Sequence, residues 1–267
     1  MTSPPEVRHP SMRQRWDKVA FMHWRYDSAG VGALLPDGIE VDPLDGDAWV
    51  SLVAFVRAVS PPRLGPAVPW LSIFLETHVR TYVRGPDGAG GIWFLSLDTD
   101  RLTAAMVGRR AYRLPYHWSR LRLETAGDVV VYKTRRRRPS RPRVHSEIAV
   151  EVGEPIPRGH MGAADRFLTD ASRAYVQGPR GIGAIDTAHE PWNLHRASVL
   201  HIDDGLVAAT GLSPPATEPV AHYSGGTEAQ VSHRIAFSGD GGRPRATVPV
   251  RPRPAFPAGP ASTPALG

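Results

Sequence analysis

The sequence predicts a mainly β protein of the α+β class, built as an antiparallel sheet or barrel with a few peripheral helices. Residues 75–84, LETHVRTYVR, alternate strictly between apolar or β-branched and polar side chains, and a period of two is typical of a strand. Many short segments of similar character follow one another between turn sequences. Alternating strand and helix units, which would build a parallel sheet, are not visible.

The first third of the chain supplies the first strands. Residues 12–27 are rich in aromatic side chains and are expected to pack against the body of the protein. A turn and a short strand follow. A second turn then leads into a long strand that ends near residue 59. The segment 60–70, SPPRLGPAVPW, is a proline-rich loop, because proline lacks a backbone donor. The strand 75–84 comes next and ends at the glycine-rich turn 85–91.

The middle of the chain predicts further strands. The segments IWFLSLDTD and LTAAMVGRRAYRL are interpreted as two strands joined by a short turn. The segments RLRLETAGDVVVYKTRRRR and RVHSEIAVEVGE also show alternation with a period of two. We expect all of them to pair in one sheet.

The last third contains the clearest helical signal. Apolar side chains recur at helical spacing over 162–177, at Phe167, Leu168, Ala171, Ala174 and Tyr175. Residues 197–211 indicate a hairpin that turns at Asp203–Gly205. From Gly239 onward, 7 prolines and 5 glycines in 29 residues predict disorder. The domain prediction is therefore a flexible leader over 1–11, a barrel domain over 12–238 and a disordered tail over 239–267.

Composition excludes several classes of chemistry. Hydrophobic residues make up 41% of the 267 residues, which is enough to bury a core, and cysteine is absent. Thiolate catalysis, disulfides and cysteine-bound metals are thus excluded. No secretory signal or membrane-spanning apolar run is visible, so we expect a cytoplasmic location. Of the 32 basic residues only Lys18 and Lys133 are lysines, which leaves few candidates for amine chemistry.

The recognised binding motifs are missing. The glycine-rich segments 85–91 and 178–184 match no nucleotide-binding fingerprint, and they are interpreted as turns. No nucleophile elbow occurs. Histidines His189 and His195, in HEPWNLH, suggest a metal site, but Pro191 prevents a helix that would align them, so a structural loop is favoured. We predict neither a metal nor a cofactor.

The basic run Arg135–Arg143 holds six arginines in nine residues. It would suit phosphate groups, yet interleaved aromatic side chains and a recognition helix are missing. A solvated loop between two strands is favoured, and nucleic-acid binding is the weaker alternative.

The polar face of the strand 75–84 is the main candidate for a functional site. Its side chains are Glu76, His78, Arg80, Tyr82 and Arg84. A polar strand face in an antiparallel sheet usually meets water. However, acids, imidazoles, guanidiniums and phenols are also the groups that acid–base sites and carboxylate clamps use. Alternation alone leaves both interpretations open.

The chain resembles a known family in the order of its segments. GDAWVSLVAF, FLETHVRTYVR, WFLSLD, GRRAYRLPYHW and HEPWNL follow one another as in the YqjF-like family of uncharacterised bacterial proteins. That family is similar to acetoacetate decarboxylase and is grouped in its superfamily. The resemblance covers roughly residues 12–235. It implies a cone-shaped, mainly antiparallel β-barrel with a polar pocket inside.

The resemblance also implies positions for the site. Glu76 falls at the place of a pocket glutamate of the decarboxylases. Those enzymes form a Schiff base through a lysine whose pKa is lowered by a second lysine. Tyr116 and His117 stand at these two places, and a phenol cannot form an iminium. The decarboxylase mechanism is therefore not expected. Lys133 would reach the pocket only if its strand face points inward, and a surface position is favoured.

The sequence therefore predicts a pocket for a small carboxylate or oxo-acid. Glu76, His117 and Tyr116 are the candidate catalytic residues, as base or as donor to a carbonyl oxygen. The candidate substrate-binding residues are Arg80, Arg109, His78 and Tyr82. An enzyme with lyase-like or acid–base chemistry and a non-catalytic metabolite-binding module both fit. Homo-oligomerisation stays open.

Overall fold

The computed structural model describes residues 7, 10–60, 73–137, 143–179 and 181–237. The predicted tail 239–267, almost all of the proline-rich loop 60–70 and part of the basic run 135–143 lie outside these residues. Within the described part of the chain, no helix is long and apolar enough to cross a membrane.

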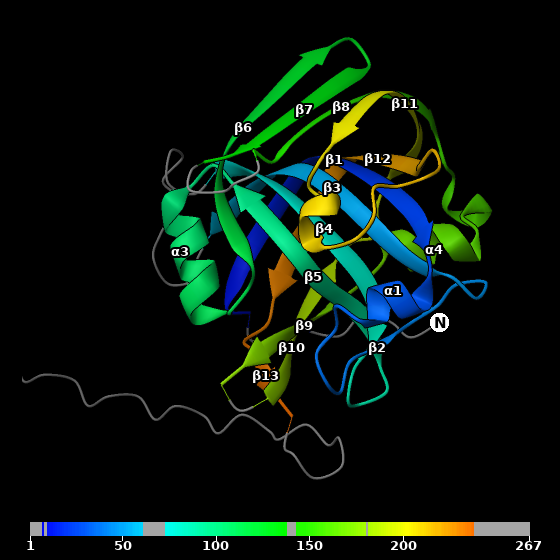
Figure 1. Cartoon of the computed structure of the whole chain (residues 1–267). Coiled ribbons are helices and arrows are strands. Elements are labelled where there is room, and N and C mark those ends of the chain that lie inside the picture. The colour runs from blue at the N-terminus through cyan, green and yellow to red at the C-terminus, as the bar shows by residue number, and fades with distance from the viewer. Residues whose placement is uncertain (1–6, 8–9, 61–72, 138–142, 180, 238–267) are drawn as a thin grey trace, which may run out of the picture.

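Strands make up most of the described chain, with a few short helices (Figure 1). The strands are β1 (Met12–Tyr26), β2 (Glu40–Val41), β3 (Ala48–Ser60), β4 (Ile73–Arg84), β5 (Gly90–Thr99), β6 (Tyr116–Ala126), β7 (Val129–Arg136), β8 (His145–Pro155), β9 (Arg173–Gly178), β10 (Gly181–His189), β11 (Leu194–Asp204), β12 (Val220–Val231) and β13 (Ile235–Ala236). The helices are α1 (Ser28–Gly32), α3 (Leu102–Ala111) and α4 (Ala163–Thr169), with short 3₁₀ turns at Arg158–His160 and Ala208–Thr210.

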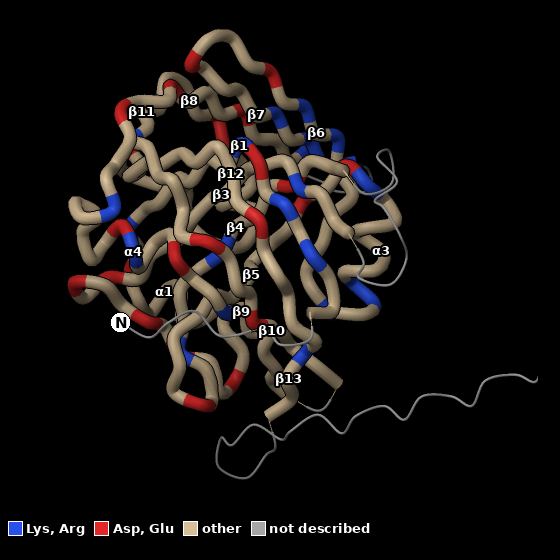
Figure 2. Tube along the Cα trace, turned by 180° about the vertical axis from the view of Figure 1, so that it is seen from behind, with Lys and Arg blue, Asp and Glu red and all other residues tan. Residues whose placement is uncertain are grey.

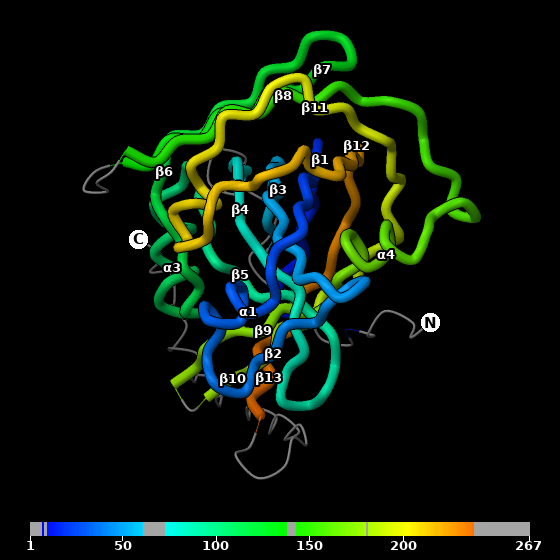
Figure 3. The backbone as a smooth tube through the Cα atoms, turned by 45° about the vertical axis from the view of Figure 1, so that its right-hand side comes forward, coloured from blue at the N-terminus to red at the C-terminus, as the bar shows by residue number. Residues whose placement is uncertain are grey.

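The strands form one sheet that closes on itself. Its order is β13-β10-β9-β5-β6-β7-β8-β11-β12-β1-β3-β4-β2, and β4 also pairs with β5, which completes a ring. Figure 3 shows β7, β8 and β11 arching over the strands β1, β3 and β4. Most pairs are antiparallel, but β5 runs parallel to β6 and to β9. The predicted mainly β barrel is confirmed, with a mixed rather than purely antiparallel sheet.

Three strands in the middle of the molecule are buried on both faces. Ala20, Leu52 and Val79, from β1, β3 and β4, pack in one core cluster, whereas Phe21 and Val53 on the opposite faces pack in a second. A strand whose two faces both pack in apolar clusters, as in β1 and β3, loses its apolar–polar alternation and becomes a continuous apolar run. This explains the segment AWVSLVAFV in β3 and the aromatic character of β1.

The structure corrects four details of the predicted elements. Residues 12–26, which were expected only to pack against the body of the protein, form a long central strand, β1. Residues 102–111, predicted as a strand, form helix α3, which has no side-chain cap at its start and so lacked the usual signal. The helix predicted over 162–177 ends at Thr169, and residues 173–178 form β9 instead. The hairpin predicted over 197–211 is absent, because β11 is followed by a 3₁₀ turn.

Strand β9 shows how tertiary contacts override a helical pattern. The ring of Tyr175 lies so close to Gly85 and Gly91 that a Cβ there would be 2.1 and 2.9 Å from it. Its hydroxyl donates to Asp87 Oδ1 and to the Ala89 carbonyl at 2.6 and 2.9 Å. The glycine-rich turn after β4 therefore receives the Tyr175 side chain, and this contact requires 173–178 to be extended.

Candidate functional site

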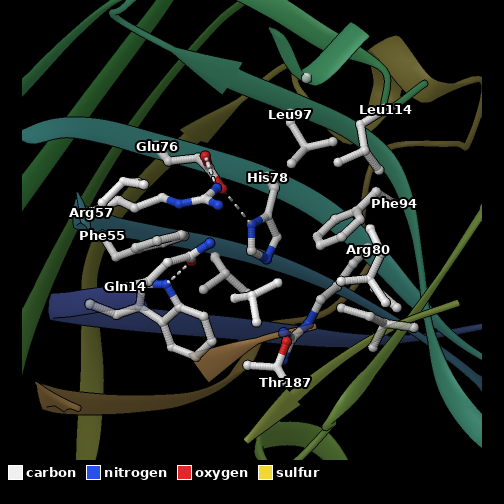
Figure 4. A pocket seen from close by; sticks show the side chains of 18 of the residues that line it. Gln14, Phe55, Arg57, Glu76, His78, Arg80, Phe94, Leu97, Leu114 and Thr187 are labelled. Carbon is white, nitrogen blue, oxygen red and sulfur yellow. Dashed lines mark hydrogen bonds and ion pairs between the residues drawn. The ribbon is translucent and has the colours of Figure 1, made fainter. Parts of the chain in front are cut away.

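The barrel encloses a cavity of about 500 Å³ on the side of the second core cluster. Strands β1, β3, β4, β5, β9 and β10 and helix α3 all contribute to its wall. Most of the lining side chains are apolar, and aromatic rings are prominent among them: Trp16, Phe21, Phe55, Phe74, Phe94, Tyr112, Tyr116 and Trp192. Figure 4 shows polar side chains set among these rings.

Strand β4 supplies the polar groups at the centre of the wall. Glu76, His78 and Arg80 alternate along the strand and all line the cavity (Figure 4). They are 2%, 6% and 6% exposed. The opposite face of β4 carries Val79, which packs in the first core cluster. From Glu76 to Arg80 the polar face of this strand is therefore turned inward, toward the cavity.

Glu76 belongs to a closed hydrogen-bonded cluster with Arg57 and Tyr116, which we call the Glu76 cluster. Arg57 Nη1 donates to Glu76 Oε2 at 2.8 Å and to the Tyr116 hydroxyl at 3.0 Å. The Tyr116 hydroxyl donates to the same Oε2 at 2.8 Å. The three side chains come from β3, β4 and β6. Gly108 of α3 makes room for the Tyr116 ring, since a Cβ there would lie 2.3 Å from Tyr116 Cδ2.

Electrostatics fix the charges of this cluster. Burial opposes ionisation of Glu76, but the positive charge of Arg57 and the contacts of His78 and Tyr116 outweigh it and lower the pKa of Glu76 to about 2. Burial, followed by the negative charge of Glu76, raises the pKa of Tyr116. At neutral pH the cluster therefore holds a carboxylate, a guanidinium and a neutral phenol.

His78 lies between Glu76 and Arg80 in the cavity wall (Figure 4). Its ring meets Phe55 and Phe94 edge-on, with centroids 5.6 and 5.0 Å apart. Its Nδ1 is 3.7 Å from Glu76 Oε1, beyond hydrogen-bond reach, and neither ring nitrogen has a hydrogen-bond partner among the described residues. Burial lowers the pKa of His78 to about 4 against the partly opposing influence of Glu76. The imidazole is neutral at physiological pH.

Arg80 is a buried cation that has no acidic partner among the residues that the structure describes. Its Nη2 donates to the Leu168 carbonyl at 3.0 Å, and its Nε has no partner. Its guanidinium carbon lies 5.8 Å from the centre of the Phe21 ring. In contrast, Arg57, Arg136 and Arg173 all form ion pairs with carboxylates. No ion pair within the described ranges includes Arg80.

Three of the residues predicted for the site do not line the cavity. Tyr82 is buried, but its hydroxyl donates to the Leu168 carbonyl, outside the cavity wall. His117 points to the opposite face of β6 from Tyr116 because strand side chains alternate. It is half-buried there. Burial, followed by the positive charge of Arg136, lowers the pKa of His117, and the negative charge of Asp98 opposes this only in part. The expectation that these side chains meet at the pocket is corrected accordingly.

Arg109 is the third residue that lies away from the cavity. It is exposed at the end of α3, and its Nε donates to the Tyr116 carbonyl at 2.6 Å. It thus holds the start of β6 through the backbone. Its contact is structural, and it supports the Glu76 cluster from outside.

Neither lysine reaches the site. Lys133 Nζ lies on the outside of the barrel, 3.2 Å from Glu147 and 3.6 Å from Glu124. These two carboxylates raise the pKa of the amine. Lys18 sits at a bulge of β1 with a φ of 51° and is not part of the cavity wall. The favoured surface position of Lys133 is therefore confirmed.

The basic run 135–143 does not form one continuous surface in the described residues. Arg136 is buried against Asp98, whereas Arg135 and Arg137 are exposed, and Arg137 stacks over the Trp118 ring at 4.3 Å. Figure 2 shows basic residues gathered along β6 and β7. No cluster of three or more possible metal ligands occurs in the described part of the chain.

Sequence reasoning missed Arg57, which is the partner of Glu76. Arg57 follows the apolar run of β3, where it resembles a residue at a strand end. The register of β3 and β4 pairs Arg57 with Phe74 and Phe55 with Glu76, so the Arg57 side chain reaches Glu76 diagonally. Arg57 lies two residues after Phe55 and four after Val53, so all three side chains share one strand face. This spacing was the signal that could have placed Arg57 on the cavity face.

Comparison with known proteins assigns both the fold and the family. An acetoacetate decarboxylase-like enzyme from Sphingomonas wittichii RW1 superposes with a TM-score of 0.57 at 12% identity, covering 86% of this chain and 94% of that one. The enduracididine biosynthesis enzyme MppR complexed with pyruvate superposes with a TM-score of 0.59 at 16% identity, covering 88% and 91%. The fold is therefore that of acetoacetate decarboxylase-like proteins.

The family follows from the sequence match. Residues 13–228 match DUF2071, described as an uncharacterized conserved protein, and the chain belongs to this family. The uncharacterized protein YqjF of Bacillus subtilis (strain 168) is 30% identical over 213 residues, which cover 80% of this chain and 87% of that protein. The resemblance noted in the sequence is confirmed.

Proposed function

We propose that the protein binds a small carboxylate or oxo-acid inside the barrel, and that Arg80 holds the carboxylate. The observation that carries this proposal is the buried guanidinium of Arg80, which has no acidic partner in the described chain. Burial of an unpaired charge is costly, and a carboxylate offers a planar guanidinium two parallel hydrogen bonds. A bound anion would supply the missing partner.

The fold supports the same class of ligand. One structural neighbour, MppR, is described in complex with pyruvate, a small oxo-acid. The ligand of this chain would bind without a Schiff base, because Tyr116 occupies the position that the family resemblance gives to the reactive lysine. Glu76 would then orient Arg57 and Tyr116, and no covalent bond to the ligand would form.

Acid–base chemistry on the bound oxo-acid is the second candidate. An ideal catalytic base has a pKa near the working pH. The pKa of Glu76, at about 2, makes the carboxylate a weak base in the free protein, and its Oε2 is already occupied by Arg57 and Tyr116. His78 is neutral and has two unpartnered nitrogens. With a pKa of about 4 it is a stronger base than Glu76, and its free nitrogens leave it able to take a proton from the carbon next to a carbonyl.

A thermal-shift comparison tests the binding proposal. Ligand binding raises the melting temperature of the folded form according to the ligand concentration relative to its Kd. A panel of 2-oxo acids should stabilise the wild type but not Arg80→Gln. Arg84→Gln is the matched control, because Arg84 lies on the same strand face but is exposed and pairs with Asp42. Equal stabilisation of both variants would contradict the proposal.

Proton exchange separates an enzyme from a binding module. An enolising protein should exchange the C3 protons of a bound 2-oxo acid for deuterium in D₂O, which proton NMR detects. We expect His78→Asn to lose this exchange while it retains binding. Binding without any exchange in the wild type would favour the non-catalytic module.

A further inference from the structure

Most polar groups that face the cavity already have partners on the protein. The Glu76 cluster is closed on itself, and Arg173 is paired with two aspartates. The buried side-chain atoms of the wall that lack hydrogen-bond partners are Arg57 Nε, Arg80 Nε and both nitrogens of His78, among the residues that the structure describes. A ligand therefore meets Arg80, a cation without an acidic partner among the described residues, and the imidazoles of His78 and His189, and needs few polar atoms to satisfy them.

The rest of the wall is apolar around these groups. Phe55 and Phe94 flank His78, and Phe21 lies against Arg80. Burial of apolar ligand surface against such side chains drives binding. A ligand with several polar groups would lose their hydration there and find few hydrogen-bond partners to replace the water. The lining therefore selects against polyhydroxylated or polyanionic molecules.

The size of the cavity exceeds what a three-carbon acid needs. Its volume of about 500 Å³ falls within the range of roughly 300–1,000 Å³ that is typical of sites for drug-sized ligands. Pyruvate would fill only a small part of it. Most of the aromatic wall would then gain no contact with the ligand.

We infer that the ligand is a monocarboxylate with a bulky apolar group, either aromatic or branched, an inference that rests on the proposed function. Its carboxylate binds Arg80 and its apolar group packs against Phe55 and Phe94. His78 lies two residues from Arg80 on the same strand face, so the two Cα atoms are about 7 Å apart. A carbonyl next to the carboxylate comes within reach of the imidazole.

Calorimetric titration of the full chain with four compounds tests this inference. The acids are pyruvate, 4-methyl-2-oxopentanoate and phenylpyruvate, and 1-phenylbutane-2,3-dione is an uncharged mimic of the last. Each buried methylene should tighten binding about fourfold. Both apolar acids should therefore bind at least about tenfold more tightly than pyruvate. The dione should bind at least about tenfold more weakly than phenylpyruvate, because it lacks the charge that pairs with Arg80.

The outcomes separate this inference from the proposed function. If pyruvate binds as tightly as the two apolar acids, the preference for a bulky apolar group is overturned while carboxylate binding stands. If the dione binds as tightly as phenylpyruvate, or if no acid binds, the proposed function itself fails. The stated order of the four affinities supports both.

Discussion

The hydroxyl of Tyr116 donates a 2.8 Å hydrogen bond to Oε2 of Glu76 inside the barrel. Arg57 Nη1 donates both to Glu76 Oε2 and to the Tyr116 hydroxyl oxygen. The family resemblance places Tyr116 where the decarboxylases carry their Schiff-base lysine. In this chain that position holds a neutral phenol, which fixes a buried carboxylate instead of attacking a ketone.

Glu76→Gln should destabilise the protein more than Tyr116→Phe. The first change leaves the buried Arg57 guanidinium without its counter-charge, which costs about 3 kcal/mol or more. The second removes a hydroxyl that makes two hydrogen bonds and should cost about 1–2 kcal/mol. Urea unfolding at pH 7 measures both free energies. A larger loss for Tyr116→Phe would contradict the assignment of the ion pair as the main interaction.

The contribution of Glu76 to stability should disappear in acid. Its folded-state pKa of about 2 lies below the usual value of 4.5, so the folded protein binds the proton less readily than the unfolded chain. The stabilisation is therefore complete above about pH 4.5 and is lost as the pH falls toward 2. The free-energy difference between wild type and Glu76→Gln should shrink by about 3 kcal/mol over this range. A constant difference would show that folding does not lower the pKa of Glu76.

Gly108→Ala should disturb the Glu76 cluster from helix α3, which forms part of the cavity wall. The new Cβ would lie 2.3 Å from Tyr116 Cδ2, so the ring or helix α3 must move. We expect a loss of about 1–3 kcal/mol in unfolding free energy and weaker binding of 2-oxo acids. Gly159→Ala is the control, since no atom lies within 4 Å of its added Cβ. Equal effects of the two substitutions would refute the close packing of Tyr116.

Borohydride should not trap a covalent adduct with acetoacetate or pyruvate. Lys133 is outside the barrel with two glutamates that raise the pKa of its amine, and Lys18 is not in the cavity wall. A protonated amine is not nucleophilic. Mass spectrometry of the treated protein should therefore show an unchanged mass. A stable adduct on Lys133 would revive a lysine mechanism.

The two-residue period of 75–84 predicted its strand, but alternation could not determine where each face points. Glu76, His78 and Arg80 are buried because β4 runs between the first core cluster and the cavity, and this depends on pairing with β3 and β5. The same period placed His117 on the opposite face from Tyr116. The family resemblance, which aligned two consecutive residues with two lysines, carried no information about strand faces.

Other misses have a similar cause. Arg57 was overlooked because its contact with Glu76 joins two different strands, β3 and β4. Local sequence does not show which residues of two strands lie diagonally opposite. Helix α3 begins at Leu102, and its N-cap residue Arg101 makes no side-chain cap, so its short apolar segment was equally compatible with a strand. The helical pattern of 162–177 was interrupted where β9 pairs with β10 and β5. Local sequence therefore predicted the class of fold better than the partners of individual side chains.

The position of a bound carboxylate tests the central claim most directly. A crystal structure of the protein with phenylpyruvate should show the carboxylate within hydrogen-bond distance of Arg80 and the phenyl ring packed against the aromatic wall that includes Phe55 and Phe94. The Glu76 cluster should remain closed. A carboxylate bound elsewhere, with Arg80 still contacting only the Leu168 carbonyl, would contradict the assignment of Arg80 as the anion-binding residue.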